Sequence, residues 1–115
     1  SLLEQLMTNL ITNSLSHGFS DKNRGKSSGT ININWQFNSE TENISLQYQD
    51  NGSGIDPDIA DQIFEPFSTS KRTGGSGLGL YICHCIVTED LKGTLTYDKT
   101  QQAGVSFYVE FPLNA

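Results

Sequence analysis

The sequence predicts an α/β (α+β) sandwich of two layers, with about three helices on one face of a mainly antiparallel mixed sheet. Apolar residues recur at helical spacing in two long segments, 1–17 and 76–91. In four short segments they alternate with polar residues, as in half-buried strands. These segments are 30–37, 44–48, 93–97 and 105–111. An Asp-Pro pair predicts a third, short helix between the second and third strands.

The first helix is expected to have two distinct faces. Its polar stripe repeats every four residues, and asparagine occurs in it twice. Because asparagine is a poor residue for a helix interior, the repetition indicates a binding task, and the alternative is a solvated face. The stripe consists of Gln5, Asn9, Asn13 and His17. The apolar face consists of Leu2, Leu3, Leu6, Met7, Leu10, Ile11 and Leu15.

A polar loop at 18–29 leads into the first two strands, which are predicted to form an antiparallel hairpin with one buried face. The second strand places Asp50 at its end. A strand-to-helix turn follows, because Asp56 is suited to cap a helix and Pro57 to open it. This short helix is expected to end at position 63 or 64.

A polar segment at 68–77 contains no apolar residue and is predicted to be a lid. Four glycines lie between Gly74 and Gly79, directly before an apolar helix. A helix N-terminus without side-chain bulk suits an anion, most commonly phosphate, although a flexible loop is the alternative. The run is neither a Walker A loop, since no Gly-Lys-Ser/Thr closes it, nor a dinucleotide fingerprint, since Leu80 replaces the third glycine.

The last predicted helix runs to about position 91 and stops at Gly93. Cys83 and Cys85 point in different directions on it, which favours small core thiols in a reducing cytosol over a disulfide or a zinc site. Its inward residues are expected to be Leu78, Ile82, Cys85 and Ile86.

Composition bounds the possible functions. The chain has 115 residues, 35% of them hydrophobic, which is enough for one domain with a modest core. Its formal charge of −6 argues against nucleic acid as a partner. No run is long enough to span a membrane, so no direct membrane contact is expected. An anionic ligand would need a local cation, such as Lys71, Arg72 or a bound divalent metal.

Four short sequence motifs occur in this order along the chain: Asn9-Leu-Ile-Thr-Asn13-Ser, Asp50-Asn-Gly-Ser-Gly54, Phe64-Glu-Pro-Phe67 and Gly75-Ser-Gly-Leu-Gly-Leu80. They resemble the N, G1, F and G2 boxes of the ATP-binding catalytic domain of sensor histidine kinases, members of the GHKL superfamily with gyrase, Hsp-type chaperones and mismatch-repair ATPases. Each box alone is weakly specific, but the four in order cover nearly the whole chain. The resemblance implies the Bergerat ATP-binding fold over residues 1–115.

The resemblance also implies roles for single residues. Asn13 would hold Mg²⁺ through its amide oxygen, and Asn9 would assist through water or phosphate. Asp50 would accept a hydrogen bond from the exocyclic amine of adenine, whereas guanine has an acceptor at that position. Glycines would close on the base and present N–H groups to the phosphates, with lid cations adding charge. The implied nucleotide site comprises Asn9, Asn13, His17, Asp50, Gly52, Gly54, Phe67, Lys71, Arg72, Gly75, Ser76, Gly77, Leu78, Gly79 and Leu80.

One departure concerns position 16, where family members often carry Lys or Arg and this chain has Ser16. His17 or Lys71 would supply the missing charge, or His17 is structural. No phosphoacceptor histidine is recognised, so no catalytic residue is expected within this domain. The chain is therefore expected to be a fragment that begins at the N-box helix and does not phosphorylate itself.

The implied function is that of a protein-histidine kinase domain that binds ATP and Mg²⁺ and donates the γ-phosphoryl group to a histidine on the dimerisation domain of the same kinase. A response regulator would be an indirect partner. The implied location is cytoplasmic, whether or not the parent protein has a membrane anchor.

Three other functions are alternatives to that of a histidine kinase domain. A GHKL-type ATPase and an anti-sigma serine kinase would carry a glutamate four residues before the metal asparagine, to act as a general base. Asn9 occupies that position and cannot accept a proton. The third alternative is a nucleotide-binding regulatory domain without transfer activity.

Overall fold

The computed structural model describes residues 1–18, 29–56, 58–66, 78–98 and 104–113. Along the chain the elements are helix α1 (Leu2–Asn13), π-helical turn η1 (Ser14–Gly18), strands β1 (Ile31–Asn38) and β2 (Asn43–Asp50), 3-10 turn η3 (Ala60–Gln62), helix α2 (Gly79–Cys85), π-helical turn η4 (Ile86–Asp90), and strands β3 (Thr94–Tyr97) and β4 (Val105–Pro112).

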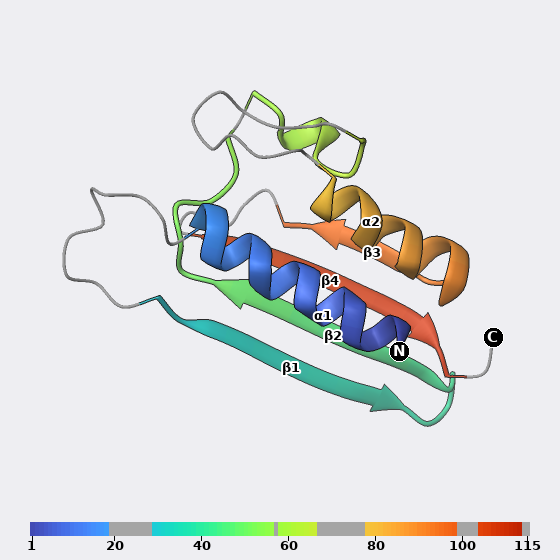
Figure 1. Ribbon diagram of the computed structural model, residues 1–115. Coiled ribbons are helices and arrows are strands. Elements are labelled where there is room, and N and C mark those ends of the chain that lie inside the picture. Colours follow the sequence, from blue (N-terminus) through green and yellow to red (C-terminus); the bar gives the residue numbers. More distant parts are fainter. Residues whose placement is uncertain (19–28, 57, 67–77, 99–103, 114–115) are drawn as a thin grey trace.

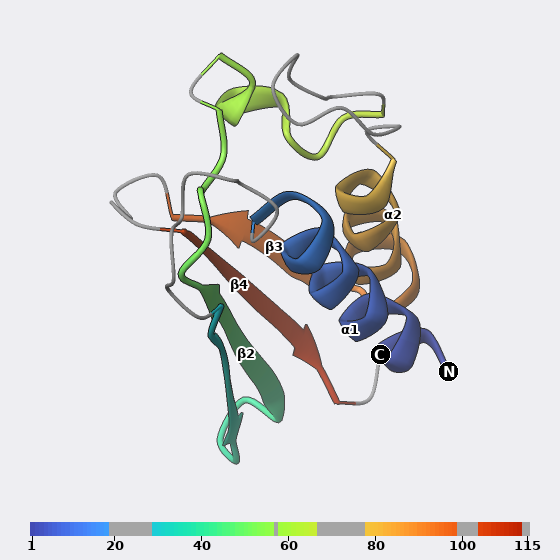
Figure 2. The ribbon, with the colours of Figure 1, turned by 60° about the vertical axis from the view of Figure 1, so that its left-hand side comes forward.

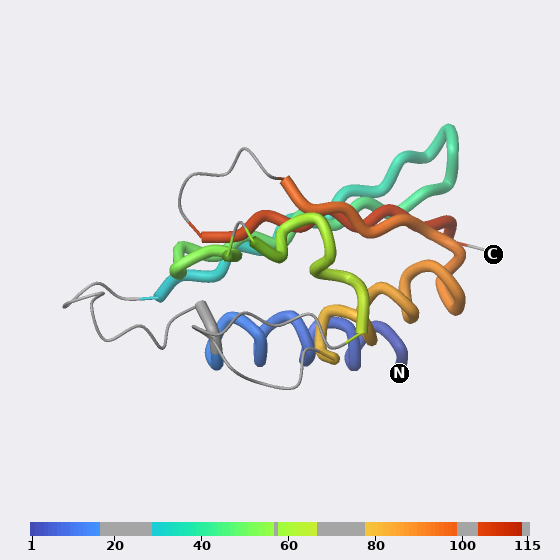
Figure 3. The backbone as a smooth tube through the Cα atoms, turned by 90° about the horizontal axis from the view of Figure 1, so that it is seen from above, coloured from blue at the N-terminus to red at the C-terminus, as the bar shows by residue number. Residues whose placement is uncertain are grey.

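The four strands form one sheet in the spatial order β1-β2-β4-β3, and every neighbouring pair is antiparallel. Viewed from above, the sheet forms one layer and α1 and α2 form the other (Figure 3). The two helices pack against each other on the same face of the sheet (Figure 1). The predicted two-layer sandwich is therefore confirmed. The helix expected after Pro57 is reduced to the three-residue turn η3.

Helix α1 begins where the sequence provides a cap. The Ser1 hydroxyl accepts a hydrogen bond from the Glu4 N–H at 3.2 Å. Leu6 and Leu10 are buried against the sheet. The predicted apolar face was too broad at both ends, because Leu2 is 42% and Leu15 is 61% exposed. Leu15 lies in η1, where the wider π turn breaks the helical phase.

Helix α2 differs from its prediction in phase. Ile82, expected inward, is 36% exposed, whereas Cys83, Ile86 and Val87 are buried. The segment is apolar on nearly every side, so its periodicity did not fix which side faces the sheet. After η4, which continues this segment, the left-handed residue is Lys92, with φ 61°, and not the predicted stop Gly93.

Gly93 has a different task. A Cβ at this position would lie 2.0 Å from the carbonyl oxygen of Glu110 on β4. The glycine therefore allows the backbone after η4 to approach the sheet closely.

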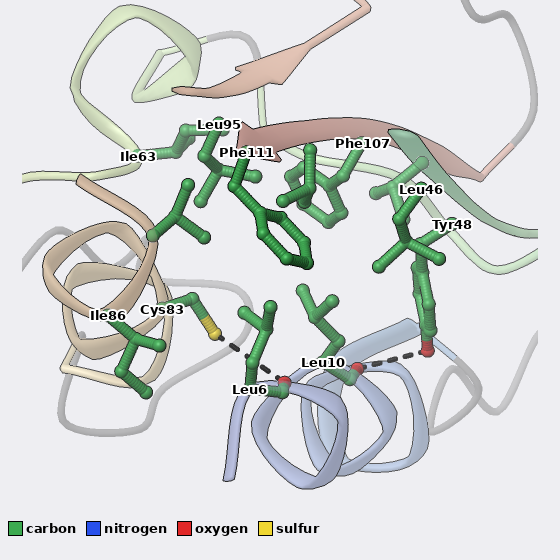
Figure 4. Packing of buried hydrophobic residues seen from close by; sticks show 13 residues of the cluster. Leu6, Leu10, Leu46, Tyr48, Ile63, Cys83, Ile86, Leu95, Phe107 and Phe111 are labelled. Carbon is green, nitrogen blue, oxygen red and sulfur yellow. Dashed lines mark hydrogen bonds between the residues drawn. The ribbon is translucent and has the colours of Figure 1, made fainter. Parts of the chain in front are cut away.

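The core fills the space between the helices and the sheet (Figure 4). Tyr48 and Phe107 are its largest fully buried side chains, and their ring centroids are 6.4 Å apart. Burial raises the pKa of the Cys83 thiol to about 12, which confirms Cys83 as an inert core thiol. His84 stacks on Phe64, with ring centroids 5.4 Å apart.

The outer strand β1 does not have the buried face that its alternation predicted. Ile33, Trp35 and Phe37 point to the same side of the sheet as the core residues opposite them on β2, yet all three are exposed. Figure 2 shows the reason, because α1 and α2 lie over the other strands and leave β1 at the uncovered edge.

Burial of Leu10 predicts a large effect on stability. Leu10→Ala should lower the free energy of unfolding by about 2–5 kcal/mol, because it leaves a cavity between α1 and the sheet. Leu15→Ala, at an exposed site, is the matched control and should change it by about 0.5 kcal/mol or less. Urea denaturation measures both, and equal losses would contradict this packing.

Candidate functional site

The site is organised around the carboxylate of Asp50, the last residue of β2, which is 5% exposed. Its Oδ1 accepts hydrogen bonds from the N–H groups of Gly52 at 3.0 Å and Val105 at 3.1 Å. Its Oδ2 accepts the Ser14 hydroxyl at 2.6 Å. Donors from the following turn, from β4 and from the end of α1 thus compensate for burying this group.

Ser14 is itself part of a buried chain of hydrogen bonds. Its Oγ lies 2.6 Å from the Tyr48 hydroxyl, which also donates to the carbonyl oxygen of Leu10 at 3.1 Å. Figure 4 shows Tyr48 pointing from β2 to this carbonyl. Burial raises the pKa of Tyr48 above its ordinary value, so the phenol keeps its proton.

Helix α1 presents two neighbouring stripes to this region. Leu6, Leu10 and Ser14 are buried and spaced by four residues. Asn9 and Asn13 each precede a member of that stripe, so they lie on its flank and are partly buried. Within the predicted polar stripe, the two asparagines are therefore not freely solvated, whereas Gln5 is exposed.

The amide nitrogen of Asn9 is buried without a hydrogen-bond partner. The Asn9 side chain lies beside the buried Cys83 thiol, whose sulfur is the neighbour this amide meets in the core. The side chain of Asn13 is partly buried at the last position of α1. The backbone of His17 lies in η1, and its side chain is outside the described part of the structure.

The glycines after Asp50 close on protein backbone. Gly54 has a φ of +81°, and a Cβ at this position would lie 3.1 Å from the carbonyl oxygen of Gly104. Gly52 donates to Asp50 as described above. Contact of these glycines with a nucleobase stays a prediction.

Only part of the glycine-rich block is described. Gly79 and Leu80 open α2, and Leu78 is its N-cap residue. Gly79 is exposed and has open space around it. The other predicted site residues lie outside the described part of the structure, as does the predicted lid: Phe67, Lys71, Arg72, Gly75, Ser76 and Gly77.

The described residues contain no cluster of three His, Cys, Asp or Glu side chains that could hold a metal ion. A single asparagine amide beside a phosphate group needs no such cluster to hold Mg²⁺, because this ion retains several waters. None of the helices in the described ranges has the length and apolar character needed to cross a membrane.

Four groups of the site were not predicted from the sequence: Ser14, Tyr48, Gly104 and the Val105 N–H. Ser14 continues the spacing of Leu6 and Leu10, which was the available signal. Tyr48 stands two residues before Asp50 and so shares its face of the sheet. A backbone N–H such as that of Val105 has no signature in sequence.

The profile of the family described as "Histidine kinase-, DNA gyrase B-, and HSP90-like ATPase" matches residues 1–115. The two-component sensor PprA of Pseudomonas aeruginosa is 37% identical over 114 residues, which cover 98% of this chain and 12% of the relative. The chain thus spans about an eighth of that protein's length.

Solved structures show the same fold. The catalytic domain of the histidine kinase ThkA, in a nucleotide-free form, superposes with a TM-score of 0.73 at 26% identity, covering 96% of this chain and 67% of that one. Full-length ShkA in complex with AMPPNP has a TM-score of 0.72 at 23% identity, covering 96% of this chain and 21% of that one. The likeness to ShkA is one of fold alone.

Gly104 provides a test of the site's geometry. Its φ is +73°, and a Cβ there would lie 1.8 Å from the backbone oxygen of Asp50 and 2.8 Å from Oδ1. Gly104→Ala should therefore displace Asp50 and destabilise the chain by more than the roughly 1–3 kcal/mol expected from backbone strain alone. Gly79→Ala, with nothing within 4 Å of the new Cβ, is the control and should be neutral or slightly stabilising in thermal denaturation. A similar effect of both changes would contradict the site geometry.

Proposed function

Because the chain belongs to the family of histidine kinase-, DNA gyrase B- and HSP90-like ATPases, and matches sensor histidine kinase catalytic domains within it, we propose that it binds Mg-ATP and donates the γ-phosphoryl group to a histidine on a separate dimerisation domain. The buried Asp50 carboxylate, held by three elements, supports this proposal most directly. Full-length ShkA, part of which has the same fold, is in complex with AMPPNP, an analogue of ATP.

In this proposal Asp50 reads the nucleobase. Its carboxylate is held in one orientation by the N–H groups of Gly52 and Val105 and by the Ser14 hydroxyl. A fixed acceptor suits the exocyclic amine of adenine and opposes the carbonyl group that guanine carries there.

The polar side of α1 would face the phosphates. Asn13 would hold Mg²⁺ by its neutral oxygen, without adding negative charge beside a triphosphate. Asn9, one turn earlier on α1, would assist through an ordered water or a phosphate oxygen. Bound ATP would supply the γ-phosphoryl group. Lys71, Arg72 and the N–H groups of the glycine block would add positive charge and donors.

The protein's part in the transfer is positioning and charge neutralisation. The nucleophile would be the imidazole of the separate domain, so this chain needs none. Asn9 stands where a hydrolytic ATPase or a serine kinase of this superfamily would need a general base, and an amide cannot accept a proton. This disfavours both alternatives.

Asp50→Asn tests the reading of the base. The change should weaken ATP binding about 10- to 100-fold, because it removes a charged acceptor from a buried hydrogen bond. Tripolyphosphate, which has no base, should bind almost as before. Isothermal titration of both ligands measures this, and equal losses would mean that Asp50 does not contact the base.

Asn13→Ala tests the metal and the transfer together. The variant should keep its circular dichroism spectrum but lose the part of ATP affinity that depends on Mg²⁺. It should also fail to pass ³²P from γ-labelled ATP to a separately added phosphoacceptor domain of the parent kinase, which the unchanged chain should label. Binding of Mg-ATP without any labelling by the unchanged chain would instead indicate a regulatory domain.

A further inference from the structure

We propose that Ser14 and Tyr48 act as a pair of positioning residues that set the nucleobase selectivity of Asp50, an inference that rests on the nucleotide-binding function proposed above. Three hydrogen bonds, two of them 2.6 Å long, join the end of α1 to the end of β2 through these side chains. Neither residue needs to touch the nucleotide, because each acts through the carboxylate.

The remaining hydrogen-bonding capacity of Asp50 is small. An ionised carboxylate offers about four acceptor sites on its two oxygens. The N–H groups of Gly52 and Val105 occupy Oδ1, and the Ser14 hydroxyl occupies one side of Oδ2. Hydrogen bonds from the described residues thus leave one acceptor position on Oδ2, and a ligand that meets the carboxylate there must present a donor.

The directions of the hydrogen bonds follow from the number of protons. Ser14 has one hydroxyl proton and lies 2.6 Å from both Asp50 Oδ2 and the Tyr48 hydroxyl. A carboxylate can only accept, so the Ser14 proton points to Asp50. The proton between Ser14 and Tyr48 must then come from Tyr48, which shares it with the carbonyl oxygen of Leu10.

This order makes a directed chain from Tyr48 to Ser14 to Asp50. Burial raises the pKa of Tyr48, so the first donor keeps its proton. Each hydroxyl that accepts one hydrogen bond while donating another becomes a stronger donor. A hydrogen bond from Ser14 holds Oδ2 in one orientation, in which the carboxylate accepts from the amine of adenine but has no proton to donate to the carbonyl oxygen of guanine. Loss of the hydrogen bonds from Tyr48 to Ser14 and from Ser14 to Asp50 should therefore weaken the preference for adenine over guanine.

These hydrogen bonds also connect the proposed sites for the two ends of the nucleotide, the base and the phosphates. Ser14 directly follows Asn13 and begins the π turn η1, a helix form that often occurs at functional sites. The residue proposed to hold the metal and the hydroxyl that orients the base-reading carboxylate are thus neighbours in sequence.

The test compares two variants with two matched controls. Ser14→Ala removes the donor to Asp50, and Tyr48→Phe removes the donor to Ser14. Ser106→Ala removes a buried hydroxyl that has no hydrogen-bond partner in the described part of the structure. Tyr108→Phe removes an exposed hydroxyl that accepts from Gln47 at 2.9 Å. Each protein is titrated calorimetrically with ATP, GTP and tripolyphosphate in Mg²⁺, after thermal denaturation has shown that it is folded.

Ser14→Ala should weaken ATP binding about 10-fold, and Tyr48→Phe, which acts through Ser14, about 3-fold. The ratio of ATP to GTP affinity should fall in both, while tripolyphosphate binding stays within about 2-fold of the unchanged chain and both controls keep the original ratio. If Tyr48→Phe fails to fold, Ser14→Ala alone tests the positioning role.

Two outcomes separate this inference from the function on which it rests. If the unchanged chain does not bind ATP, the proposed function is wrong, and the inference fails with it. If the unchanged chain prefers ATP but Ser14→Ala keeps that preference, or loses tripolyphosphate to the same extent as ATP, the positioning role is overturned and the proposed function stands.

Discussion

Burying the carboxylate of Asp50 constrains much of the surrounding structure. A charged group that is 5% exposed is stable only with several donors, and no single segment here provides enough of them. The turn after β2 gives one N–H, β4 gives another, and α1 gives a hydroxyl. Satisfying one side chain therefore joins the helix layer to the middle of the sheet.

The local irregularities near Asp50 follow from this constraint. Gly54 and Gly104 both adopt positive φ, and their backbones pass too close together for larger residues. Ser14 interrupts an otherwise apolar buried stripe on α1, at the point where the helix widens into a π turn. A serine at this position would weaken a purely apolar core, but here it completes the hydrogen bonding of a buried charge.

Sequence alone could predict the sandwich, Asp50 at a strand end and the asparagine stripe, because each depends on local periodicity or on chain order. It could not predict that β1 stays uncovered, since alternation says which residues share a face but not whether a helix lies over it. Ile82 was misplaced because α2 is apolar on nearly every side. Ser14 and Tyr48 became visible as site residues only when the fold brought together positions 34 residues apart.

The account depends on Asp50 being an acceptor that the fold keeps in one orientation for a purine amine. A crystal structure of the chain with AMPPNP and Mg²⁺ tests this most directly. The adenine amine should lie about 2.9 Å from Oδ2 of Asp50, with Ser14 and Val105 still bonded to the same carboxylate. A base bound elsewhere, or a carboxylate that has turned away from Ser14 to meet it, would contradict the account.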